Sequence, residues 1–180
     1  RLSRVLAELS CLDVRLFPDW ETLPYDSFSP HQDIISARLS ALFHLQQRKQ
    51  GIFILPIATL MQRVCPSSYL QHRVLLINKG DRFVIETLRL QLEKSGYRAV
   101  EQVLEHGEYA VRGALLDLFP MGSAVPFRLD FFDDEIDSIR TFDVDTQRTL
   151  QEIDQINLLP AHEFPTDNQG IEFFRSQFRA

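Results

Sequence analysis

Residues 107–145 read GEYAVRGALLDLFPMGSAVPFRLDFFDDEIDSIRTFDVD, and this stretch decides the fold of the region around it. It holds three runs that are rich in β-branched and aromatic residues, at 110–119, 127–132 and 136–143. Two compact turn sequences, Pro-Met-Gly-Ser and Asp-Asp-Glu, separate the runs. Runs of this kind bounded by turn residues are typical of strands, so the stretch predicts an antiparallel meander.

The middle run of this meander divides its side chains between two faces, because successive side chains of a strand point in opposite directions. One face is apolar and the other carries charges, the two sets being Phe127, Leu129 and Phe131, and Arg128, Asp130 and Phe132. The apolar set predicts a core-facing side. A phenylalanine on the charged side is unfavourable in water unless something covers it. Phe132 is therefore a candidate binding residue.

The charge of the chain narrows the possible partners. The 180 residues include 44% hydrophobic and 11% aromatic residues, enough for a packed core, and carry a net charge of −6. Three arginines and nine acidic residues give the stretch 107–145 this whole net charge. Such acidity argues against general nucleic-acid binding through a broad basic surface. The arginines of this stretch either form internal ion pairs or contact a partner selectively; they are Arg112, Arg128 and Arg140. The charge of the stretch does not distinguish between these two roles.

The two cysteines, Cys11 and Cys65, lie far apart and form no CxxC motif. This spacing indicates neither a disulfide framework nor a zinc site, and it fits a reducing cytoplasm. The sequence has no apolar run of membrane-spanning length and no charged-then-apolar leader. It begins with Arg1, as an excerpt from a longer chain would.

The first part of the chain predicts an α/β unit. Helical spacing at 1–12 and 29–43, the second with a Ser-Pro-His-Gln capping sequence, alternates with strand-like runs at 14–17 and 51–56. A short helix at 59–64 follows. Alternation of this kind favours a parallel sheet covered by helices. Two strands are too few to stand alone, so we expect completion by residues upstream of Arg1, by a later strand at 153–159, or by both.

A second unit follows. A strand at 74–77 and a helix at 81–95, closed by Gly96, lead into the meander, which predicts one helix against an antiparallel sheet. We therefore expect an α/β domain over 1–72, an inserted α+β domain over 73–155, and a segment over 156–180 that returns to the first domain. A last amphipathic helix is expected at 171–178.

One enzymatic reading attaches to the Asp-Asp-Glu sequence at 133–135, which resembles the magnesium-holding acidic motif of nucleotide hydrolases. That chemistry also needs a glycine-rich phosphate loop with a lysine, and the sequence contains no GxxxxGK[ST]. Alternation further splits these carboxylates between two faces, which disfavours a metal site. The five histidines show no ligand spacing. We therefore expect a solvated turn, no cofactor and no metal.

Arg112 precedes a glycine inside its strand-like run, and this predicts a β-bulge or a close backbone approach, with the glycine re-aiming the arginine. Two roles are open to it. Arg112 either pairs internally with Asp117 or Glu108, or it contacts a partner.

Five segments together carry a family resemblance: PDWETLPYDSFSPH at 18–31, TLMQR at 59–63, GEYAVRG at 107–113, DLFP at 117–120 and RLDFFDDEID at 128–137. With these motifs the chain resembles the N-terminal region of the bacterial transcription-repair coupling factors, a region similar to the excision-repair protein UvrB. The resemblance implies a degenerate helicase-like domain, UvrB domain 1-like, interrupted by an α+β antiparallel-sheet domain, UvrB domain 2-like, that docks UvrA.

In that family the docking surface consists of arginines and a neighbouring aromatic residue on the inserted sheet, which implies UvrA-binding roles for Arg112, Arg128 and Phe132. The chain is then expected to be a monomeric, non-catalytic adaptor that recruits excision repair to stalled RNA polymerase. RNA polymerase and DNA would be bound by downstream domains. If Arg128 and Phe132 face outward, replacing either leaves stability nearly unchanged. The alternatives are a nucleotide-binding domain and a UvrB-like DNA-damage reader, although the first domain shows no aromatic hairpin for the latter.

Overall fold

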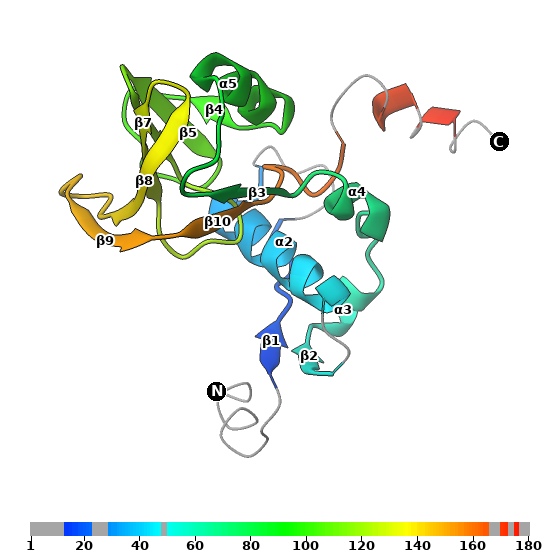
Figure 1. Ribbon diagram of the computed structural model, residues 1–180. Helices are drawn as coiled ribbons and strands as arrows, with labels where there is room; N and C mark the ends of the chain where they lie inside the picture. Colours follow the sequence, from blue (N-terminus) through cyan, green and yellow to red (C-terminus); the bar gives the residue numbers. More distant parts are fainter. Residues whose placement is uncertain (1–12, 23–28, 48–49, 166–169, 173–174, 177–180) are drawn as a thin grey trace.

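The computed structural model describes residues 13–22, 29–47, 50–165, 170–172 and 175–176. The helix expected at 1–12, Cys11, and part of the last helix lie outside the described residues. In Figure 1 the six-stranded sheet and the β1–β2 pair lie at opposite ends of the described elements. One end holds a six-stranded sheet with α5, the other holds β1 and β2, and α2 lies between them with the β3–β10 pair.

The described elements between residues 13 and 72 alternate between strand and helix, as expected. The bounds are β1 Val14–Leu16, α2 Gln32–Gln47, β2 Ile52–Ile54, α3 Ile57–Leu60 and α4 Ser67–Gln71. β1 and β2 pair in parallel, as predicted. The expected helix at 59–64 is shorter and earlier, and α4 is an additional helix, because Pro56 and Pro66 each place a short helix directly after themselves.

The sheet end contains the meander together with α5 and the two edge strands β4 and β9. Its bounds are α5 Ile85–Lys94, β4 Arg98–Ala99, β5 Glu108–Arg112, β6 Leu115–Leu118, β7 Phe127–Phe132, β8 Glu135–Phe142 and β9 Thr149–Ile153. The strand order is β4-β5-β6-β7-β8-β9, antiparallel throughout except for the parallel β4–β5 pair. The expected run at 110–119 is two strands, because residues 113 and 114 form a tight turn.

Gly113 has a φ of +62°, a backbone conformation that glycine adopts without a steric penalty. The predicted bulge is therefore wrong, because the glycine makes a two-residue hairpin turn. The alternative of a close backbone approach is wrong as well, because a Cβ atom at Gly113 would meet nothing within 4 Å. A register shift occurs instead between Asp130 and Phe131, in the pairing of β7 with β8.

The strand expected at 153–159 does not join β1 and β2. It forms β10, Gln155–Leu158, which pairs antiparallel with β3, Leu75–Asn78. In the described part of the chain the parallel sheet therefore consists of β1 and β2 alone. The chain enters and leaves the six-stranded sheet through two strands that lie side by side.

The inner face of the sheet packs on α5 as the alternation of β7 predicts. Phe127, Leu129 and Phe131 are buried, whereas Phe132 is exposed. Leu88 and Leu92 of α5 belong to the same buried cluster. Gly96 ends this helix with a φ of +89°, as expected, and its missing side chain leaves room for the ring of His162.

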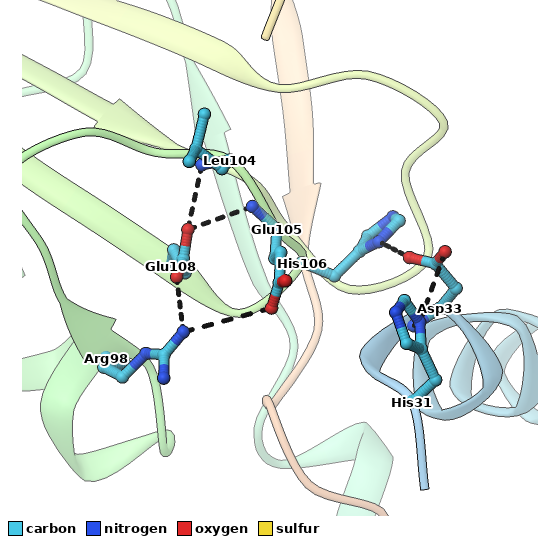
Figure 2. A network of polar contacts seen from close by, with 7 residues as sticks. All are labelled: His31, Asp33, Arg98, Leu104, Glu105, His106 and Glu108. Carbon is cyan, nitrogen blue, oxygen red and sulfur yellow. Dashed lines mark hydrogen bonds and ion pairs between the residues drawn. The ribbon is translucent and has the colours of Figure 1, made fainter.

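A polar junction joins the sheet end to α2 (Figure 2). The ring of His106 has its Nδ1 atom 2.8 Å from Oδ1 of Asp33 in α2 and its Nε2 atom 2.8 Å from the carbonyl oxygen of Ser123. The ring also packs on Phe119, with 4.0 Å between the ring centroids. These contacts tie the loop before β5 to the first turn of α2.

Figure 2 also shows how the start of β5 is fixed. The buried carboxylate of Glu108 accepts hydrogen bonds from the backbone N–H groups of Leu104 and Glu105, at 2.8 and 2.9 Å, and from Arg98 at 2.5 Å. Burial raises the pKa of Glu108, but these hydrogen bonds outweigh burial and lower it overall. Glu108 is thus occupied by Arg98.

Candidate docking face

The face of the sheet opposite α5 carries a row of side chains that crosses five strands. The strand registers place Ala110, Asp117, Arg128, Arg140 and Glu152 opposite one another in this order. A second row runs through Arg112, Leu115, Asp130 and Ser138. We call these two rows, with Phe132, the docking face. Asp117 lies opposite Arg128 and Glu152 lies opposite Arg140, so charges of opposite sign can pair within the sheet, although Arg128 and Arg140 also lie opposite each other.

Asp117 lies at the centre of the docking face and binds two of the predicted site residues. Its carboxylate, of which 1% is exposed, accepts hydrogen bonds from Nε and Nη2 of Arg128 at 2.7 and 2.9 Å. The same carboxylate accepts a short hydrogen bond from Nη2 of Arg112. Of the two internal partners that the sequence leaves open for Arg112, Asp117 is the one it contacts.

Arg128 is largely covered. Its Nη1 atom donates to the carbonyl oxygen of Gln147 at 3.3 Å, and its guanidinium lies 5.0 Å from the ring centre of Phe142. Only 16% of the side chain is exposed. The hydrogen bond to Asp117 raises the pKa of Arg128 above its ordinary value, so the guanidinium keeps its positive charge at every physiological pH.

These contacts change one expectation. Outward orientation predicts that replacing Arg128 leaves stability nearly unchanged, but the arginine neutralises a buried carboxylate, and a buried charge without a partner is costly. The alternation correctly gives the face of Arg128, but it cannot give the cover supplied by residues 142–147. Sequence reasoning misses both neighbours, because Phe142 lies two residues beyond the position opposite Arg128 on β8 and Gln147 lies in the loop after β8.

Phe132 lies at the end of β7, beside the turn to β8, and 80% of it is exposed. It is roughly 13 Å from Arg128 along the strand, at about 3.3 Å per residue. Asp133, the first turn residue, has a φ of +58°. The structure thus brings Arg112 and Arg128 together on one carboxylate and places Phe132 separately on the same face.

The docking face is not open along its whole length. A small buried cluster of Val103, Ala110, Phe119 and Phe142 covers the end away from Phe132. Next to it, Arg140 lies 3.7 Å from Asp130 and donates to the Ser138 hydroxyl at 2.8 Å. The accessible part is therefore the end that carries Arg112, Arg140 and Phe132.

The described residues give no support to a metal site at the Asp-Asp-Glu sequence. Residues 133 and 134 form a tight turn, as expected, and Glu135 faces Arg82 at 3.5 Å. Across the described part of the chain, no group of three or more His, Cys, Asp or Glu side chains is arranged to hold a metal ion. None of the helices in that part is both long and apolar enough to cross a membrane.

The six-stranded sheet lies within a segment that matches a known protein family. Residues 75–164, half of the chain, match the UvrB interaction domain, and this segment runs from β3 through the whole six-stranded sheet to the residues after β10. The chain belongs to the UvrB interaction domain family. The match contains all of the docking face.

Relatives extend the similarity beyond the interaction domain. The chain is 84% identical over 179 residues to a transcription-repair-coupling factor of Haemophilus influenzae, and 63% identical over 179 residues to one of Escherichia coli. Each match covers 99% of this chain. A transcription-repair-coupling factor of Staphylococcus aureus is 30% identical over 161 residues, which is 89% of this chain. The resemblance seen in the sequence is thus confirmed. The chain spans 14 to 16% of the length of these relatives.

Proposed function

We propose that this chain is a non-catalytic adaptor that binds UvrA through the accessible end of the docking face. The observation that carries the proposal is the exposure of Phe132 on a sheet face that also holds Arg112, Arg128 and Arg140. Aromatic and arginine side chains are the residue types that most often dominate binding at protein–protein interfaces, and this face presents both. Membership of the UvrB interaction domain family supports UvrA as the partner.

In this proposal the two kinds of side chain have different tasks. Phe132 supplies apolar area that becomes buried at the interface, as the anchor residues of interfaces do. The arginines supply charge that pairs with carboxylates of UvrA, since a guanidinium fork matches a carboxylate in geometry. Because the chain carries a net charge of −6, its overall charge does not attract an acidic partner over long distances. The arginines then act only through direct contact with carboxylates of the partner.

The relatives are much longer than this chain, and they bear the name transcription-repair-coupling factor. We propose that the chain performs the recruiting step of that coupling and brings excision repair to a stalled RNA polymerase. Contacts with RNA polymerase and DNA are assigned to segments of the longer proteins outside these 180 residues.

The test is a titration of purified UvrA with this chain and with a Phe132→Ala variant. We expect saturable binding that the variant weakens by about 2 kcal/mol or more, roughly thirtyfold in Kd. The matched control is Met61→Ala. Met61 is 81% exposed but lies just after α3, remote from the sheet. Equal binding by the Phe132→Ala and Met61→Ala variants would show that the docking face is not the UvrA site.

A further inference from the structure

The two arginines on Asp117 differ in how many of their donors remain available. An arginine carries five N–H donors. Arg128 directs three of its nitrogens into the protein, two to Asp117 and one to the carbonyl oxygen of Gln147. The N–H groups that remain on Arg128 belong to a side chain of which only 16% is exposed, so the cover over Arg128 restricts the approach of a partner's carboxylate.

Arg112 is placed differently. It ends β5 next to the turn at Gly113, and 49% of its side chain is exposed. One of its nitrogens, Nη2, contacts Asp117. This contact holds one side of the guanidinium while about half of the side chain stays exposed to a partner. A cation held in place before binding loses less conformational freedom when a partner arrives.

We infer that Arg112 is the arginine that binds a carboxylate of the partner, and that Asp117 and Arg128 are positioning residues that act through Arg112. Arg128 neutralises and orients Asp117, and Asp117 in turn orients Arg112. This inference rests on the proposed binding of UvrA to the docking face. It goes beyond that proposal because it assigns unequal roles to two arginines on the same sheet face, and adds Asp117 to the functional set.

A charge-neutral replacement of the pair formed by Arg128 and Asp117 can distinguish the role of Arg128 from that of Arg112. Replacing Arg128 and Asp117 together by glutamine and asparagine removes one positive and one negative charge, so the net charge is unchanged. The two amides can still hydrogen-bond across β6 and β7, where these residues are directly opposite. The amide oxygen introduced at position 117 can also still accept a hydrogen bond from Arg112. If Arg128 only positions, the double variant keeps most of the affinity for UvrA.

The experiment compares the Arg112→Gln variant with the Arg128→Gln/Asp117→Asn double variant in titrations of UvrA at several salt concentrations. We expect Arg112→Gln to weaken binding by at least about tenfold, the value of a charged hydrogen bond, and to flatten the salt dependence. The double variant should lose less than about fivefold and keep the salt dependence of the unmodified chain. A double variant that binds as weakly as Arg112→Gln, with the same flattened salt dependence, would overturn the inference.

Two further variants keep the outcome clear. If the double variant does not fold, Arg128→Lys and Arg112→Lys replace it, because a lysine can still neutralise Asp117 but cannot form a fork. We then expect the larger loss of affinity at position 112, and a larger loss at position 128 contradicts the roles assigned. Phe132→Ala distinguishes a failure of the proposed docking face from a failure of the roles given to the two arginines. If that variant binds UvrA normally, the docking face is wrong, whereas if only the order of the arginines is reversed, the face stands and this inference fails.

Discussion

Arg38 and Glu163 form an ion pair in which neither side chain is exposed, although 125 positions separate them in the sequence. Nε and Nη2 of Arg38 donate to the two carboxylate oxygens at 2.7 and 3.1 Å. The guanidinium also lies between the rings of Phe17 and Trp20, 4.3 and 4.1 Å from their centres. This pair joins α2 to the segment that follows β10, so it fastens the returning chain to the first part of the fold.

Removing Arg38 should therefore be severe. Arg38→Ala leaves the Glu163 carboxylate buried without a cation, and breaking a buried pair in this way costs about 3 to 5 kcal/mol of unfolding free energy. Urea denaturation measures the loss. Arg82→Ala is the control, because Arg82 is 71% exposed and its pairing with Glu135 contributes at most about 1 kcal/mol. Similar losses from both variants would contradict the role given to the buried pair.

Stability and binding should separate along β7. Leu129→Ala removes a fully buried side chain and should cost about 2 to 5 kcal/mol of unfolding free energy through lost burial and a cavity. Phe132→Ala removes an exposed side chain, so its effect on stability should stay within about 0.5 kcal/mol. Thermal melts of the two variants decide this, and a Phe132→Ala variant that melts as early as Leu129→Ala would mean that β7 has the wrong face outward.

His162 should make stability depend on pH. Burial lowers its pKa below the ordinary 6.5, so the folded chain resists a proton that the unfolded chain accepts. Its penalty is absent above the unfolded pKa and grows as the pH falls below 6.5 toward the folded pKa. Between about pH 7.5 and 5.5, the melting temperature of the unmodified chain should therefore fall more than that of a His162→Gln variant. Parallel decreases in the two proteins would exclude His162 as the cause.

The chain should not hydrolyse ATP. No phosphate loop of the GxxxxGK[ST] type occurs in the sequence, and residues 133 and 134 form a turn between β7 and β8. We expect neither phosphate release nor thermal stabilisation by ATP with magnesium. Hydrolysis that copurifies with the chain and disappears in an Asp134→Asn variant would revive the nucleotide-binding alternative.

The sequence predicts the faces of this sheet better than its connections. The alternation of Phe127, Leu129 and Phe131 is enough to orient β7, because the period of a strand is two and one face is buried. Gly113 is ambiguous in the sequence, since both a bulge and a two-residue hairpin place glycine at a positive φ. Only the pairing of β5 with β6 decides between them.

The candidate site is predictable as a set of residues but not as an arrangement. The resemblance indicates Arg112, Arg128 and Phe132, and the structure places them on one face. The sharing of Asp117 depends on the registers of two hairpins, which no local pattern contains. Likewise, the cover over Arg128 comes from Gln147, whose backbone adopts a φ of +57° that its residue type does not foretell.

The pairing of β3 with β10 brings the two crossings of the chain into the sheet end to one place in the fold. Lys79 and Asp154, the first residues beyond this pair, are joined by a backbone hydrogen bond of 2.8 Å. The two points at which the chain crosses into the sheet end are thus one strand spacing apart, about 5 Å. A related sheet could therefore be exchanged at these two points, provided that it keeps the contacts that His106 and Gly122 make with α2. Under the proposed function, a chimaera that carries a foreign sheet on this stem takes on the partner preference of the donor.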